Sequence, residues 1–271
     1  MPRTKFLLPA LCLAASFSLS QTYLPDLQNR AMQVVPRIAP KAFAFPLSEV
    51  RLLESPFSRA MRLDAQYILS LEPDRLLHRF RLNAGLEPKG ALYGGWEQET
   101  ISGHTLGHYL SACALMYSAT SDPRFKQRID YVVDELTRCQ DARGTGYVGG
   151  IPNEDTIFAQ VARGEIRAAG FDLNGGWVPW YTMHKLLAGL LDAYIQSGNA
   201  KALGIASRLG DWVGRELKDL NDEQIQRMLA CEHGGMNEAL ANLYAATGKS
   251  SYLELSRKFH HRAVLDSLAR R

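Results

Sequence analysis

One stretch of this sequence that could do chemistry contains two histidines four positions apart. His104 and His108 lie in "SGHTLGHYLSA", and residues four apart share one face of a helix. The H-x3-H spacing is compatible with a metal ion. However, Thr105 and Leu106 follow His104, so the glutamate of a zinc-protease motif is missing and no third ligand is evident. Three interpretations stay open, namely a metal site, hydrogen bonding to a sugar or another substrate, and packing in the interior.

A second group lies in "NGGWVPWYTMHKLLAG", where His184 follows Trp180 by one helical turn. An indole offers an apolar plate with one N–H donor, which suits the C–H face of a sugar ring beside its hydroxyls. His184 either caps a neighbouring loop through a ring nitrogen or contacts a ligand. Trp180 on the same face favours contact, and we expect Trp177 and Tyr181 to be packing residues.

A third group follows the glycine pair of "GGMNEALANLYAATG". Asn237 is either a helix cap or a ligand for a hydroxyl group. Glu238 stands in the first turn of a predicted helix, where the helix dipole favours a carboxylate, and it is also a candidate site residue. Glu97 and Glu99 flank Gln98. Paired carboxylates suit glycoside hydrolysis, but their separation does not follow from sequence.

The elements that must position these groups are helices arranged in repeats. Three segments each contain an apolar helix, a short turn and a second amphipathic helix, with turns at residues 121–123, 197–199 and 247–249. Such segments are αα-hairpins in tandem. The first helix of each is the more apolar, which predicts an all-α fold with inner and outer helices, an incomplete (α/α)6 toroid; an open α-solenoid is the competitor. Parallel inner helices would bring the three groups to one rim.

The remainder of the chain is predicted to be helical or irregular. Residues 57–82 carry apolar side chains at helical spacing, and no long stretch alternates with a period of two. The connections at residues 140–176 and 218–235 are long and rich in Gly, Asn, Asp and aromatics, as functional loops often are. We divide the chain into a signal peptide at 1–20, a linker at 21–44 and a partial helical domain at 45–271.

The composition and the amino terminus indicate an exported globular protein. The chain has 271 residues, 46% hydrophobic and 22% charged, with a net charge of +3, so a nucleic-acid partner is not expected. Arg3 and Lys5 precede a short apolar run and a small-x-small cleavage site at 18–20. This predicts a periplasmic or secreted protein with no membrane segment after cleavage; an uncleaved anchor is the alternative.

The cysteines do not predict a metal site or a disulfide scaffold. Cys12 belongs to the predicted signal, and Cys113, Cys139 and Cys231 are widely spaced. We expect each of these three to be a small apolar residue in a helix.

The three quoted motifs together resemble a known family. "SGHTLGHYLSA", "GGWVPWYTMHKLLAGLLDAY" and "GGMNEALANLYAATG", in this order, resemble the amino-terminal half of bacterial β-L-arabinofuranosidases of glycoside hydrolase family 127 and the related family 146. The resemblance runs from about Phe45 to the end of the chain. It implies an (α/α)6 barrel, followed in the family by β-sandwich domains, and release of β-linked L-arabinofuranose from plant glycans and arabinosylated hydroxyproline.

The resemblance also implies roles for individual residues. His184 matches a family histidine that touches the arabinofuranose, and His108 and the "GGMNE" turn line the same pocket. His104, Asn237 and Glu238 are carried over from the same motifs. The family nucleophile is a cysteine thiolate on a zinc ion held by further cysteines and a glutamate, with another glutamate as acid/base. Those positions lie beyond Arg271 in the family sequence.

We therefore expect no catalytic residue, metal ligand or cofactor in this chain. Three hairpins also fall short of a six-hairpin ring, so we expect a truncated domain, inactive alone, that associates with a missing carboxy-terminal half. The expected partner is an arabinose-containing oligosaccharide or glycan. Two alternatives remain, namely a polysaccharide lyase with Tyr181 and His184 as the proton-transfer pair, and a non-catalytic helical solenoid that binds a carbohydrate or a partner protein.

Overall fold

A computed structural model describes residues 31–38 and 41–270, and most of these residues are helical. The main helices are α1 (Pro56–Ser70), α4 (His104–Thr120), α5 (Pro123–Arg143), α7 (Pro179–Ser197), α8 (Ala200–Glu216), α10 (Met236–Thr247) and α11 (Ser250–Lys258). Shorter elements are η1 (Leu47–Glu49), α2 (Pro73–Leu76), α3 (His78–Asn83), η2 (Gly95–Gln98), α6 (Glu154–Ala162), α9 (Asp222–Met228) and α12 (Arg262–Ala269).

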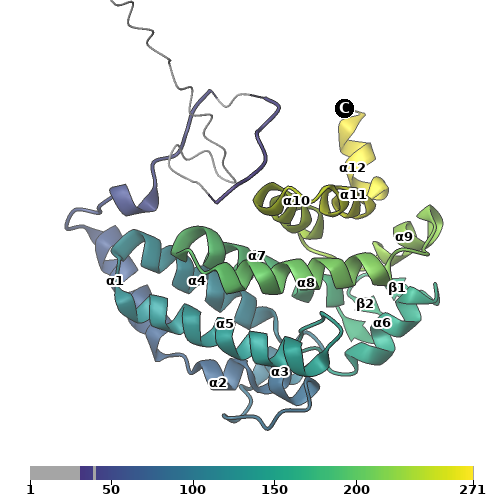
Figure 1. Ribbon diagram of the computed structural model, residues 1–271, viewed down its shortest axis with the longest axis horizontal. Coiled ribbons are helices and arrows are strands. Elements are labelled where there is room, and N and C mark those ends of the chain that lie inside the picture. The colour runs from purple at the N-terminus through teal and green to yellow at the C-terminus, as the bar shows by residue number, and fades with distance from the viewer. Residues whose placement is uncertain (1–30, 39–40, 271) are drawn as a thin grey trace, which may run out of the picture.

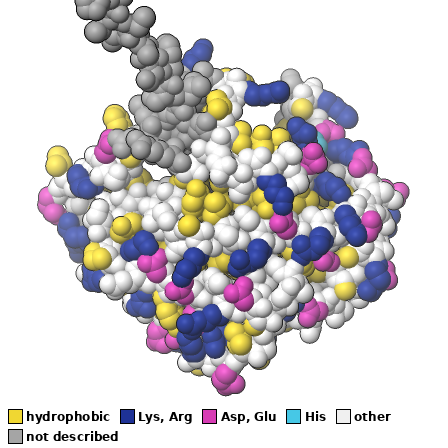
Figure 2. All heavy atoms as spheres, in the orientation of Figure 1, with side chains coloured by type: hydrophobic (Ala, Val, Ile, Leu, Met, Phe, Trp, Pro, Cys, Tyr) yellow, Lys and Arg dark blue, Asp and Glu magenta, His cyan; other side chains and the backbone are white. Residues whose placement is uncertain are grey.

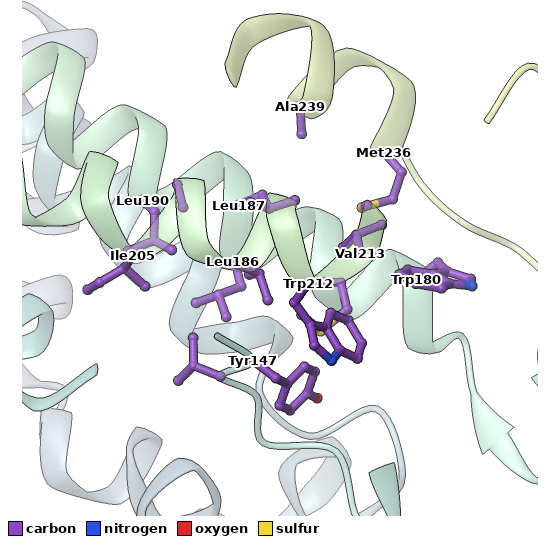
Figure 3. Packing of buried hydrophobic residues seen from close by; sticks show 14 of the residues in the cluster. Tyr147, Trp180, Leu186, Leu187, Leu190, Ile205, Trp212, Val213, Met236 and Ala239 are labelled. Carbon is purple, nitrogen blue, oxygen red and sulfur yellow. The ribbon is translucent and has the colours of Figure 1, made fainter. Parts of the chain in front are cut away.

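The three predicted hairpins are present as α4–α5, α7–α8 and α10–α11, which follow one another in Figure 1. Helix α7 packs against both α4 and α10, while α8 packs against both α5 and α11. The first helices thus form an inner row and the second helices an outer row. The assignment of inner and outer helices from their apolar content is confirmed. In Figure 3, Leu186 and Leu190 of α7 lie in the buried cluster with Ile205 of α8.

Each hairpin turns where the local sequence predicts. Ser121 and Gly198 end the inner helices α4 and α7 in the left-handed conformation, with φ of 57° and 70°. The outer helices then begin at caps. The Asp122 side chain accepts a hydrogen bond from Arg124 N, and the Asn199 side chain accepts one from Ala202 N. These caps satisfy backbone donors that a helix start leaves unpaired.

The inner helices α4 and α7 touch through their backbones. A Cβ on Gly107 would lie 2.2 Å from the carbonyl oxygen of Lys185, and a Cβ on Gly189 would lie 2.4 Å from the carbonyl oxygen of Gly107. No side chain fits at either position. The contact holds the starts of α4 and α7 in register, because His108 adjoins Gly107 and His184 adjoins Lys185.

Two local predictions need correction. The apolar pattern over 57–82 does not form one helix, because α1 ends at Ser70 and the chain resumes as α2 and α3. Pro73 has no backbone N–H and restricts the preceding residue, so it starts a new helix. The loop before α7 also contains a small antiparallel sheet, β1 (Ala168–Ala169), β2 (Asp172–Leu173) and β3 (Gly176–Trp177), which sequence periodicity did not predict.

The amino-terminal region is described only in part. The predicted signal peptide lies outside the described residues. Within the predicted linker, the N–H groups of Gln33 and Val34 both donate to the carbonyl oxygen of Ala245, at 2.8 and 3.1 Å, and Met32 is buried. This short segment therefore packs on the end of α10.

The visible surface carries charges of both signs. In Figure 2, Lys and Arg side chains alternate with Asp and Glu over the helices of this face. Among the described residues, no helix has the length and apolar character needed to cross a membrane.

Candidate functional site

Four ring side chains from two inner helices meet at the rim predicted from the sequence. His104 and His108 come from α4, and Tyr181 and His184 come from α7. Ring centroids are 6.1 Å apart for His104 and His108, 6.2 Å for His104 and Tyr181, and 6.5 Å for Tyr181 and His184. His108 Nε2 lies 3.4 Å from Tyr181 Oη. The amino ends of α4 and α7 thus present one continuous set of rings.

The glycine pair before α10, Gly234 and Gly235, packs directly against the His184 ring. The backbone N–H of Gly235 donates to His184 Nδ1 at 3.1 Å. A Cβ on Gly234 would lie 2.6 Å from Nδ1, and a Cβ on Gly235 would lie 2.9 Å from Nε2. Only glycines allow this approach, so the loop shapes the environment of the imidazole.

This contact determines which nitrogen of His184 carries the proton. Because Nδ1 accepts a hydrogen bond, the neutral ring has its proton on Nε2. Burial lowers the pKa of His184 to about 4, helped by the charges of Lys185, His108 and His233. The ring is therefore neutral near pH 7, with Nε2–H as a donor. No hydrogen bond from Nε2 to another described residue is present.

Glu238 of α10 lies beside the same glycine loop. A Cβ added to Gly235 would lie 2.9 Å from His184 Nε2 and 3.2 Å from Glu238 Oε2, so both atoms border this glycine. Glu238 also contributes to a raised pKa of Asp192, although burial is the larger cause there. Asp192 accepts a hydrogen bond of 2.6 Å from Ser111 Oγ. A donor and an acceptor thus border the same glycine loop at the rim, with further polar groups along α4 and α7.

His104 is a buried member of the rim whose polar atoms serve the fold. Its Nδ1 lies 2.9 Å from the carbonyl oxygen of Ile101 and therefore donates to it. Next to it, the buried carboxylate of Glu97 accepts from Gly103 N at 2.9 Å and from Ser102 Oγ at 3.2 Å. Glu97 thus caps the start of α4, whereas Glu99 is exposed. The carboxylates of Glu97 and Glu99 therefore lie in different surroundings, one buried and one in solvent.

Trp180 does not lie where the sequence interpretation put it. Its side chain is only 1% exposed, and its ring packs against Phe158, Phe259 and Trp212 at centroid distances of 5.0, 5.4 and 6.3 Å. Figure 3 shows it among the buried residues near Trp212. A sugar ring cannot stack on this indole, and the plate proposed at Trp180 was wrong. The neighbouring Tyr181, predicted to be a packing residue, faces the histidines instead.

Asn237 also lies away from the rim histidines. Its carbonyl oxygen accepts a hydrogen bond of 2.6 Å from Ser256 Oγ. Its side chain lines a different surface cavity of about 470 Å³, together with Gln226, Ser256 and His260. None of His104, His108 and His184 lines that cavity. Consecutive residues of a helix differ by about 100° in direction, which explains why Glu238 reaches the rim and Asn237 does not.

Sequence reasoning missed Lys185, which adds a positive charge to this region. Its Nζ lies 5.0 Å from the centroid of the Tyr181 ring, and its charge helps to lower the pKa values of His108 and His184. The spacing of Tyr181 and Lys185, four apart on one helix face, was the signal that could have found both.

The described cysteines do not fit a zinc–thiolate centre. Cys113, Cys139 and Cys231 are buried and free. Burial raises the pKa of Cys139 to about 11 and those of Cys113 and Cys231 to about 12, whereas zinc binds the thiolate. Over residues 31–38 and 41–270, no three His, Cys, Asp or Glu side chains form a group that could hold a metal ion.

Comparison with known proteins identifies the family of this chain. The family model "Beta-L-arabinofuranosidase, GH127 catalytic domain" matches residues 49–271. Among solved structures, the chain is similar to a GH127 beta-L-arabinofuranosidase from Geobacillus stearothermophilus T6, with a TM-score of 0.54 and 19% identity. The match covers 78% of this chain but only 32% of the solved one. This likeness supports the all-α toroid. No curated protein sequence gives a significant match.

Proposed function

Because the chain belongs to the family of β-L-arabinofuranosidase GH127 catalytic domains, we propose that its rim binds a terminal L-arabinofuranose of a plant-derived glycan. The proposed partner is thus an arabinose-containing oligosaccharide or glycan. The family name indicates an arabinofuranosidase, and the full reaction that we propose is exo-hydrolysis of that sugar.

One observation carries this proposal, the free Nε2–H donor of His184. Gly235 occupies Nδ1, so the ring can hydrogen-bond a ligand only through Nε2. The carboxylate of Glu238 adds an acceptor near the same glycine loop, and His108 and Tyr181 add two further polar ring atoms. Sugar hydroxyls both donate and accept, so a mixed set of donors and acceptors beside ring faces suits them.

We further propose that this chain supplies sugar contacts without the cleaving groups. Among the described residues, the three cysteines are buried and no three potential ligands form a group that could hold a metal ion, and the chain spans 32% of the solved relative. A nucleophile, an acid/base and zinc would then come from an associated carboxy-terminal half. Export to the periplasm or medium is part of the same proposal, and amino-terminal sequencing of the cellular protein tests it.

The experiment measures sugar binding and turnover by the whole chain. Calorimetry with methyl β-L-arabinofuranoside should show binding to the wild type and at least tenfold weaker binding to His184→Ala, since roughly 1.4 kcal/mol separates each factor of ten. His260→Ala is the matched control, because His260 lies in the other cavity. None of the three proteins should release arabinose.

Two results would count against the proposal. Equal binding by His184→Ala and the wild type would remove the rim as the sugar site. Release of arabinose at an ordinary enzymatic rate would show that this chain does contain the cleaving groups.

The lyase alternative receives less support from the geometry. Burial and the nearby charge of Glu232 raise the pKa of Tyr181, whereas a tyrosine base needs its phenolate accessible near neutral pH. Release of ultraviolet-absorbing products from uronate polymers would nevertheless support the lyase activity. Sugar binding without turnover would also agree with a non-catalytic carbohydrate-binding solenoid. The aromatic contact of such a solenoid could not come from Trp180, because that side chain is buried.

A further inference from the structure

Trp96 is a large aromatic side chain that the fold leaves in solvent. Its exposed fraction is 62%, whereas Trp180 and Trp212 are 1% and 7% exposed and Trp177 is half-buried. An indole is one of the side chains whose burial is most favourable. Trp96 lies in η2 (Gly95–Gln98), the short helix that precedes the rim helix α4 in the chain.

The neighbouring loops hold the inner side of this indole in place. The Trp96 ring meets the Trp177 ring nearly edge-on, at 5.8 Å and 70°, and the His104 ring at 6.0 Å. The next residue, Glu97, is buried and bonded to the start of α4. The N–H of Trp177 donates to Thr100 Oγ1 at 2.9 Å, which ties the two loops together. The exposed ring is therefore presented by anchored backbone.

Trp96 extends the series of rings that forms the rim. His104 contacts Trp96 on one side and Tyr181 on the other, at 6.0 and 6.2 Å, and Tyr181 contacts His184 at 6.5 Å. Because two rings separate Trp96 from His184, one pentose does not touch both. A glycan whose terminal sugar lies at His184 can reach Trp96 with its next units.

We propose that the exposed surface of Trp96 is a stacking platform for a sugar unit that follows the terminal arabinofuranose in the bound glycan. The ligand class is a furanose or pyranose ring presenting its C–H face, which packs on an indole while its hydroxyls stay in water. This subsite rests on the proposed function, because it requires the terminal sugar to lie at His184. It selects oligosaccharides over monosaccharides.

The test compares two ligands and follows tryptophan fluorescence. The wild type should bind an arabinofuranose-terminated trisaccharide more tightly than methyl β-L-arabinofuranoside. Trp96→Ala should reduce trisaccharide affinity roughly tenfold, the scale of a stacked aromatic contact, and leave the monosaccharide unchanged. Trp96→Phe should keep part of the difference. Phe57→Ala, which removes another exposed aromatic of 76% exposure on α1, is the control and should change neither affinity.

Fluorescence quenching reports directly on Trp96, because it is the most exposed of the four tryptophans. The trisaccharide should protect the wild type from acrylamide quenching, and the monosaccharide should not. Equal trisaccharide affinity in Trp96→Ala and the wild type would overturn the platform.

The outcomes separate the platform from the proposed function. If His184→Ala weakens both ligands but Trp96→Ala weakens neither, the arabinose site stands and the platform falls. If Trp96→Ala alone weakens the trisaccharide, sugar binds at Trp96 without its terminal unit at His184, and the proposed function falls together with the platform that depends on it. A wild type that binds neither ligand overturns both.

Discussion

At the scale of single residues, backbone contacts decide what the polar groups of the rim can do. Gly235 donates to Nδ1 of His184 and leaves Nε2 as a donor, whereas Ile101 accepts from Nδ1 of His104. Two histidines of one rim thus have different roles, one available to a ligand and one engaged by the fold. The difference comes from backbone groups of the adjoining loops, whose positions cannot be deduced from helical spacing.

We predict that the state of His184 makes folding stability fall in mild acid. The imidazole titrates at 6.5 in the unfolded chain and at about 4 in the folded one. Between these values only the unfolded state binds the proton, so the free energy of unfolding decreases as pH falls from about 6.5 to about 4. The shift corresponds to at most about 3 kcal/mol. Burial lowers the pKa values of His108 and His233 in the same direction.

Urea unfolding at pH 7.5 and 4.5 measures this loss in the wild type and in His184→Asn. The amide oxygen of asparagine can still accept from Gly235 but does not titrate, so the variant should lose less stability on acidification. His260→Asn is the control, because His260 is exposed and pairs with Asp266. The same pH dependence in His184→Asn and the wild type would show that His184 does not govern it.

At the scale of elements, the close contact of α4 and α7 sets the geometry of the rim. Gly107 and Gly189 let the two backbones meet, and His108 and Tyr181 reach hydrogen-bonding distance as a result. The outer helices carry none of the four rim rings. Two helical glycines, unfavourable in isolated helices, are thus explained by packing.

We predict that Gly107→Ala is destabilising although alanine is the better helix former. Its Cβ would lie 2.2 Å from the Lys185 carbonyl, and separating the helices should cost about 2 kcal/mol. Gly204→Ala in α8 is the matched control, because nothing lies within 4 Å of its added Cβ; it should stabilise by about 0.5–1 kcal/mol. Thermal and urea unfolding give both values. A neutral Gly107→Ala would mean that the two helices separate without cost.

At the scale of the whole molecule, the described domain has apolar side chains in solvent at both ends of the hairpin series. On and near α1, Leu53, Phe57 and Tyr67 are 84%, 76% and 65% exposed. On α12, Val264 and Leu268 are 51% and 60% exposed. Grouped apolar side chains of this kind mark surfaces that associate with other protein. They agree with the proposed association with a further part of the toroid.

We predict concentration-dependent self-association of the isolated chain. Sedimentation velocity should show a rising mass with concentration, and Val264→Lys combined with Leu268→Lys should reduce it by removing the apolar face of α12. Ser267→Lys adds a charge at an exposed polar position of the same helix and should have little effect. A chain that stays monomeric at all concentrations, or associates equally in the double variant, would contradict the role of α12.

Much of the fold follows from local sequence, and less of the candidate site does. The three hairpins, their turns at 121–123, 197–199 and 247–249, and the apolar inner helices were predictable, because turn residues and helical periodicity act over a few positions. The apolar positions at helical spacing over 57–82 did not indicate where this stretch divides, which Pro73 determines by starting a new helix. The two-residue strands at 168–177 are too short for periodicity to reveal.

The order of residues along the chain is enough to place polar and aromatic groups at the starts of the inner helices. Which of these groups face one another depends on the packing of the helices. A difference of one residue rotates a helical side chain by about 100°, so Trp180 is buried while Tyr181 reaches His108. For the same reason Glu238 lies near the glycine loop of the rim, while Asn237 lines another cavity. Those outcomes depend on how α4, α7 and α10 pack, and the Gly107–Gly189 contact and the Gly234–Gly235 loop act between segments far apart in sequence.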